Sequence, residues 1–141
     1  MFKISAHLDN SQNLHDISLT TNHNTHTITI APRAAGFGSS ANGGELLFLA
    51  LATCYCNDIY REAAKQNIQV YRVEVEVNGE FAETPGSVAQ NITYRATVEA
   101  QASQSAILAL MRHTDTVAEI QNTLRQGMSV QLIEAVAIPR G

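Results

Sequence analysis

The chain has 141 residues, of which 45 % are hydrophobic and 16 % charged, and its formal net charge is −4. This length suits one domain with a core of its own, so we expect a single domain over residues 1–141. The acidic balance and the lack of a basic stripe argue against a nucleic-acid partner. The first ten residues lack the apolar run of a signal peptide, and no segment is apolar for long enough to cross a membrane. We therefore expect a cytoplasmic protein with no membrane partner.

Three strands are expected in the first third of the chain. Apolar residues alternate with polar ones in three short runs, at residues 2–6, 14–19 and 27–30. The segments between these runs, "DNSQN" and "TNHN", are typical of turns. The stretch "PRAAGFGSSANGG" at 32–44 then predicts a flexible surface loop.

A long helix is expected from about residue 43 to residue 66. Asn42 and Glu45 have the spacing of a capping box, and Asn67 supplies a C-terminal stop. Residues 46–56 are apolar on every face of such a helix. Residues 58–66 are amphipathic, with Glu62 on the outer face and Ala64 on the inner one. So short a chain cannot cover an all-apolar helix by itself, which predicts a homodimer whose second subunit supplies the cover.

The rest of the chain predicts two strands, two short helices and a last strand. Residues 71–77 and 91–100 alternate between apolar and polar side chains, as in an antiparallel sheet with one buried face. Ser103 is expected to cap the first short helix and Thr116 the second, which ends at Gly127. Residues 128–138 are expected to form the closing strand. The predicted fold class is therefore α+β with an antiparallel sheet.

Cys54 and Cys56 are the only cysteines, and both lie in the predicted long helix. Residues two positions apart on a helix point about 200° apart, so a disulfide between them would require the helix to break. Neither the cysteines nor the histidines show metal-ligand spacing, so we expect no metal and no cofactor. One cysteine can be a reactive thiol, or both can be small apolar core residues, and composition leaves both interpretations open. Glu45 does not share a helix face with Cys54, and its place in the cap accounts for it.

Two segments of the chain, "GGELLFLALATC" and "REAAKQNIQVYRVEVEVNGE", resemble the OsmC/Ohr family of osmotically inducible and organic-hydroperoxide-resistance proteins. The resemblance covers residues 32 to 80 and, through the order of strands and helices, the rest of the chain. It implies an intertwined homodimer in which long central helices lie between two antiparallel sheets, with two sites at the subunit interface. It also implies defence against oxidative stress by a thiol peroxidase that reduces organic hydroperoxides.

The same resemblance assigns Cys54 as the peroxidatic cysteine and Glu45 as the glutamate of the Glu-Leu-Leu pattern, so both are candidate catalytic residues. His113 matches the histidine of the family's second motif, but Thr116 stands where the second, resolving cysteine is expected. The expected activity is therefore a one-cysteine cycle with an external thiol reductant, which requires a wet, electropositive setting for Cys54. Two alternatives stay open. One is a non-catalytic protein that binds a small apolar or acyl ligand at the dimer interface, and the other is an interaction module with inert cysteines.

Overall fold

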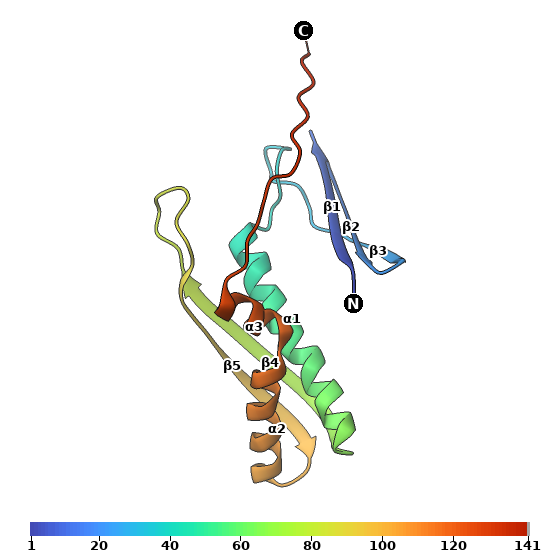
Figure 1. Cartoon of the computed structure of the whole chain (residues 1–141), viewed down its shortest axis with the longest axis vertical. Coiled ribbons are helices and arrows are strands. Elements are labelled where there is room, and N and C mark those ends of the chain that lie inside the picture. The colour runs from blue at the N-terminus through green and yellow to red at the C-terminus, as the bar shows by residue number, and fades with distance from the viewer. Residues whose placement is uncertain (141) are drawn as a thin grey trace. The chain divides into compact units, whose positions relative to one another are not determined.

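The computed structural model describes residues 1–140, which form two compact units (Figure 1). The first unit is Met1–Leu47, and the second begins at Phe48. One helix, α1 (Gly43–Lys65), starts in the first unit and continues through the second. None of the helices in the described residues has the length and apolar character needed to cross a lipid bilayer.

The first unit contains a three-stranded antiparallel sheet, as the alternating pattern predicts. Its strands are β1 (Ile4–Ser11), β2 (Leu14–Thr21) and β3 (Asn24–Ile28), in the order β1-β2-β3. Asn13 and Asn22 occupy the two hairpin turns with positive φ angles of 61° and 54°. Asparagine tolerates this left-handed conformation better than most residues, so the two turns follow from the sequence.

Both ends of α1 lie where the sequence predicts them. At the start, Asn42 Oδ1 accepts a hydrogen bond from the Glu45 N–H at 2.7 Å, and Glu45 Oε1 accepts one from the Asn42 N–H at 2.9 Å. This reciprocal pair is the capping box. At the other end, Asn67 has a φ of 56° and its N–H donates to the carbonyl of Ala64. The left-handed residue ends the helix and satisfies one of its last carbonyls.

The faces of α1 differ from the sequence prediction at two positions. Glu62 was expected on the outer face but is only 4 % exposed, whereas Ala64 is exposed. The reason is that His113, Arg61 and Lys65 all bond to the Glu62 carboxylate, so three positively polarised donors stabilise its burial.

The second unit is built on the hairpin of β4 (Gln69–Glu80) and β5 (Gln90–Gln101). Its apolar side chains face α1 and α2 (Gln104–Val117), which run along the same side of the hairpin (Figure 1). As predicted, the side chain of Ser103 caps α2 by accepting from the Ala106 N–H. The buried core consists of Tyr55, Ile59, Ala63, Val70 and Leu110. Helices packed with purely antiparallel sheets confirm the α+β class.

The end of the chain departs from the prediction in two ways. Thr116 does not begin a helix, because it lies in the last turn of α2, where its hydroxyl donates to the His113 carbonyl. The last helix, α3 (Glu119–Gln126), follows the buried Ala118 and ends at Gly127 as expected. The predicted strand at 128–138 is wrong for the single chain, since no neighbouring strand within the described residues pairs with it. Its apolar side chains are exposed, including Val130 and Ile133 at 95 % and 90 %.

Candidate active site around Cys54

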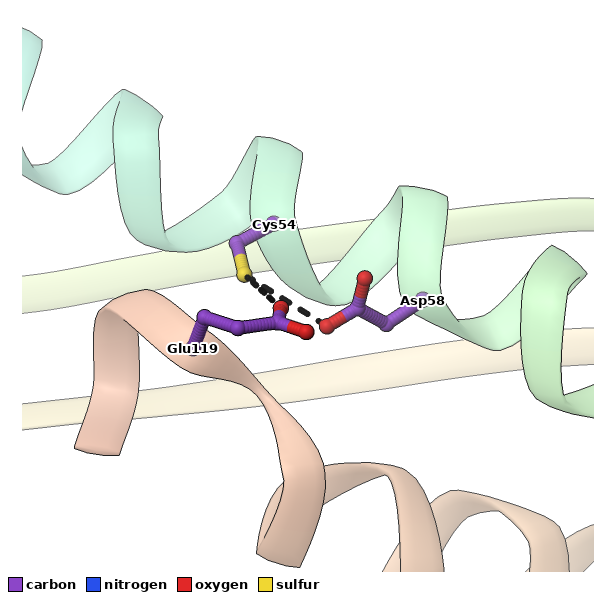
Figure 2. A group of neighbouring side chains, drawn as sticks. All are labelled: Cys54, Asp58 and Glu119. Atoms are coloured by element: carbon purple, nitrogen blue, oxygen red, sulfur yellow. Dashed lines mark hydrogen bonds between the residues drawn. The ribbon is translucent and has the colours of Figure 1, made fainter. Parts of the chain in front are cut away.

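The Cys54 thiol lies between α1 and the start of α3 and is half-buried. Its Sγ lies 3.5 Å from Asp58 Oδ2 and 3.6 Å from Glu119 Oε2, and it can donate to either carboxylate. Asp58 is one helical turn further along α1, whereas Glu119 is the first residue of α3. The three side chains point toward one another (Figure 2). The thiol therefore has two proton acceptors within reach.

Arg61 links the two carboxylates from their other side. Its Nη1 lies 3.1 Å from Asp58 Oδ1 and 2.9 Å from Glu119 Oε1. Its Nε donates to Glu62 Oε2 at 2.8 Å. Each carboxylate thus turns one oxygen to the guanidinium and the other to the sulfur. The Asp58 and Glu119 carboxylates therefore lie between the positive charge of Arg61 and the Cys54 sulfur.

The surroundings of Cys54 favour the neutral thiol. Burial raises its pKa most, and the charges of Asp58 and Glu119 raise it further. One contact acts in the opposite direction, because the backbone N–H of Ile120 in the first turn of α3 stabilises the thiolate and lowers the pKa. The expected electropositive setting is therefore not found among residues 1–140 of the single chain. The thiol instead hydrogen-bonds to the carboxylates of Asp58 and Glu119, and the Ile120 N–H can donate a hydrogen bond to the thiolate once it forms.

The two carboxylates differ in their affinity for protons. Burial, together with the neighbouring Glu119, raises the pKa of Asp58, and Arg61 only partly opposes this. Burial also raises the pKa of Glu119, but its own backbone N–H, Asp58 and Arg61 outweigh this and lower it below the usual range. The Asp58 side chain is 8 % exposed and that of Glu119 is 61 % exposed. Asp58 is therefore the stronger base of the pair.

A second cluster of charges adjoins the first through Arg61. Glu62 accepts hydrogen bonds from Arg61, Lys65 and His113, the last at 2.7 Å. These three donors lower the pKa of Glu62 to about 2. His113, which the family resemblance pointed to, therefore bonds to Glu62, whereas the side-chain hydrogen bonds described for Cys54 go to Asp58 and Glu119. This arrangement fixes the guanidinium of Arg61 beside the thiol cluster.

The other cysteine and the predicted glutamate each have surroundings of their own. Cys56 faces the opposite way and lines a shallow pocket of about 260 Å³ against β4. Both cysteines are free thiols, as their helical spacing predicts. Glu45 belongs to the first unit, where it forms the capping box. A catalytic role for Glu45 stays a prediction.

Three residues of the site were missed by the sequence reading. Asp58 and Arg61 follow Cys54 by four and seven residues, and this spacing places all three on one helix face. That signal was available. Glu119 carries no such signal, because only the packing of α3 on α1 brings it to the sulfur.

Within residues 1–140, one group of side chains has donor atoms close enough together to share a metal ion. The donor atoms of Cys54, Asp58 and Glu119 all lie within 4.8 Å of one another. Arg61 bonds to both carboxylates from the other side.

A small pocket lies next to the thiol cluster. It has a volume of about 210 Å³ and is lined mainly by apolar side chains and by Gln121 and Arg125. Leu51 in its wall is one turn before Cys54, and Gln121 is two residues after Glu119. Gln121 is buried and donates from Nε2 to the Leu51 carbonyl at 3.0 Å, while its Oε1 has no partner.

A sequence model of the family described as "OsmC-like protein" matches residues 36–133. No curated protein matches the chain. Among solved structures, an OsmC-like protein from Mycoplasma pneumoniae is 18 % identical, with a TM-score of 0.61 over 89 % of this chain and 87 % of that one. A hypothetical protein from Aquifex aeolicus VF5 has a TM-score of 0.62 at 13 % identity, over 89 % and 88 % of the two chains. An organic hydroperoxide resistance protein from Elizabethkingia anophelis, with thiocyanate bound, has a TM-score of 0.55 at 14 % identity over 89 % of both chains. These likenesses establish the fold.

Proposed function

The chain belongs to the OsmC-like family, and we propose that it is a one-cysteine thiol peroxidase that reduces organic hydroperoxides, with Cys54 as the nucleophile. The observation that carries this proposal is the position of the Cys54 sulfur. It is half-exposed, lies between two carboxylate proton acceptors and has the Ile120 N–H beside it. A similar fold in a protein named for organic hydroperoxide resistance supports the substrate class. Defence against oxidative stress would be the role of such an activity.

The proposed reaction needs an outside reductant. Attack of the sulfur on the hydroperoxide gives an alcohol and a sulfenic acid on Cys54. An external thiol then condenses with the sulfenic acid and releases water, and a second thiol frees Cys54 as the reductant becomes a disulfide. Cys56 faces away, and Thr116 has no sulfur, so neither residue can resolve the intermediate within one chain.

We also propose that the protein acts as a homodimer with one OsmC-like domain per chain. The family match crosses the boundary between the two compact units, which supports a single domain. The exposed apolar side chains of residues 128–138, together with Leu49 on α1, support a second subunit as their cover. A cytoplasmic location, where thiols stay reduced, fits the proposed cycle.

The test is a peroxidase assay on three purified proteins: wild type, Cys54→Ser and Cys56→Ser. With cumene hydroperoxide and a dithiol, wild type and Cys56→Ser should turn over, and Cys54→Ser should not. Dimedone should label only Cys54 after hydroperoxide treatment, because it reacts with sulfenic acids. Equal turnover by wild type and Cys54→Ser, or none by either, would remove the peroxidase proposal.

A second candidate function is supported by the pocket beside the cluster. Its apolar wall and the unpartnered Oε1 of Gln121 suit a small apolar or acyl ligand that carries one hydrogen-bond donor. An apolar fluorescent probe should then bind and be displaced by primary fatty amides, whose N–H can donate to this oxygen, equally in wild type and Cys54→Ser. Binding of this kind in a protein without peroxidase activity would favour this function over the first.

A further inference from the structure

We propose that Asp58 is the proton shuttle of this site, taking the proton of the Cys54 thiol as sulfur attacks and returning it to the leaving alkoxide. The inference rests on the proposed function and adds a catalytic residue to it. The family resemblance gave Glu45 as a candidate catalytic residue, whereas the structure places the Asp58 carboxylate at the sulfur.

The first support is geometric. Asp58 Oδ2 lies 3.5 Å from Sγ, and the i, i+4 spacing on one continuous helix holds the two groups together. The other oxygen, Oδ1, is held by Arg61 at 3.1 Å. Arg61 is itself fixed by Glu62, which His113 and Lys65 hold in place. The oxygen that faces the sulfur is therefore the one that bonds to no cation, and the Asp58 carboxyl group also hydrogen-bonds to the Glu119 side chain.

The second support separates Asp58 from Glu119. Both carboxylates touch the sulfur, but Asp58 is buried and Glu119 is largely exposed. Their proton affinities are pushed in opposite directions, upward for the pKa of Asp58 and downward for that of Glu119. Because the two pKa values are shifted apart, Asp58 can take up a proton while Glu119 stays ionised. Glu119 accordingly stays a carboxylate that holds Arg61.

In the proposed step Asp58 carries one proton from the thiol to the alkoxide. The thiol proton passes to Asp58 Oδ2, and the sulfur anion is stabilised by the Ile120 N–H. A sulfur electron pair then forms the bond to the outer, hydrogen-bearing peroxide oxygen, and the O–O bond breaks with its electron pair on the alkoxide. Asp58 gives its proton to the alkoxide. Cys54 is oxidised to sulfenic acid, the hydroperoxide is reduced to an alcohol, and Asp58 returns to its starting state.

The test compares two reactions of Cys54 in Asp58→Asn, both in a Cys56→Ser background. Alkylation by iodoacetamide needs only the thiolate, and the variant loses a negative charge at the sulfur, so alkylation at pH 7 should be faster. Hydroperoxide reduction also needs the shuttle, and should be slower by about 100-fold or more, the usual contribution of a positioned acid or base. A merely structural role for Asp58 would move both rates in the same direction.

Glu119→Gln is the matched comparison, since it removes a negative charge from the other side of the sulfur and leaves Asp58 in place. It should speed alkylation likewise, with a much smaller loss of hydroperoxide reduction than Asp58→Asn. Circular dichroism shows whether each variant is folded. The pH profile of wild type in single-turnover reduction gives a second, mutation-free readout. A plateau between the titrations of Asp58 and Cys54 is expected, and a rate that rises in proportion to thiolate alone would overturn the shuttle.

The outcomes for the two proposals are distinct. If wild type reduces hydroperoxide and Asp58→Asn reduces it equally fast, only the shuttle fails. An equal loss in Asp58→Asn and Glu119→Gln also overturns the assignment to Asp58. If wild type shows no Cys54-dependent reduction, the peroxidase proposal and the shuttle fail together.

Discussion

The two sides of α1 hold the same functional group in opposite surroundings. Cys54 faces Asp58, Glu119 and, one carboxylate further, Arg61. Cys56 lines a pocket whose other walls are uncharged. The two cysteines are separated by one residue of sequence, so local composition cannot distinguish them. The chemistry of each thiol is decided by the element that packs against its side of the helix: α3 for Cys54 and β4 for Cys56.

The largest expected effect is a loss of stability on truncating a core side chain that supports both sides of α1. Ile59 is fully buried in the core between α1, the hairpin and α2. Ile59→Ala leaves a cavity there and should lower the free energy of unfolding by about 2–5 kcal/mol. Urea unfolding followed by circular dichroism measures this change. Ala64→Ser on the exposed side of α1 is the control, and an equal loss there would contradict the assigned core.

A smaller effect is expected from a substitution that changes the surroundings of Cys54 but not those of Cys56. Arg61→Gln removes the cation that bonds to both Asp58 and Glu119, and leaves buried Asp58 with the thiol as its remaining hydrogen-bond donor within residues 1–140. The expected cost is roughly 1–3 kcal/mol of stability. The pKa of the Cys54 thiol should rise further, so its alkylation at pH 8 slows, while that of Cys56 does not change.

Lys65→Gln is the matched control for Arg61→Gln. It removes a cation that bonds to Glu62 and has no contact with the thiol cluster. Alkylation of Cys54 should stay at the wild-type rate in this variant. A similar slowing in both variants would mean that general surface charge, rather than the position of Arg61, controls the thiol.

Much of the fold was predictable, because helices and hairpins depend on residues that are close in sequence. The capping box at Asn42, the stop at Asn67 and the alternating hairpin strands each follow from local patterns. The strand predicted at 128–138 failed in the single chain because a strand needs a neighbour for its backbone groups, and the described residues offer none.

The candidate site was less predictable than the fold. The sequence and its resemblance identified Cys54, and helical spacing could have added Asp58 and Arg61. Glu119 lies 65 residues after Cys54, and only tertiary packing brings it to the sulfur. The sign of the charge around the thiol therefore could not be obtained from the sequence.

A still smaller effect concerns pH and the cluster behind Arg61. The pKa of Glu62 is lowered from 4.5 to about 2 by its three donors. Its ionised form is therefore favoured by folding, so its stabilisation is fully present above about pH 4.5 and is lost as the pH falls toward 2. Glu62→Gln should be less stable than wild type at pH 6, and the difference should shrink on acidification. Melting temperatures from pH 6 to pH 2 measure this, and parallel curves would contradict it.

The smallest expected change tests whether Glu45 belongs with Cys54 or only with the helix cap. Glutamine can replace glutamate in a capping box, so Glu45→Gln should change stability by less than about 0.5 kcal/mol. Asn42→Ala removes the other half of the box and should cost roughly 1 kcal/mol. If Glu45 serves the cap alone, hydroperoxide reduction in Glu45→Gln stays at the wild-type rate. A loss of reduction with unchanged melting would instead give Glu45 a catalytic role.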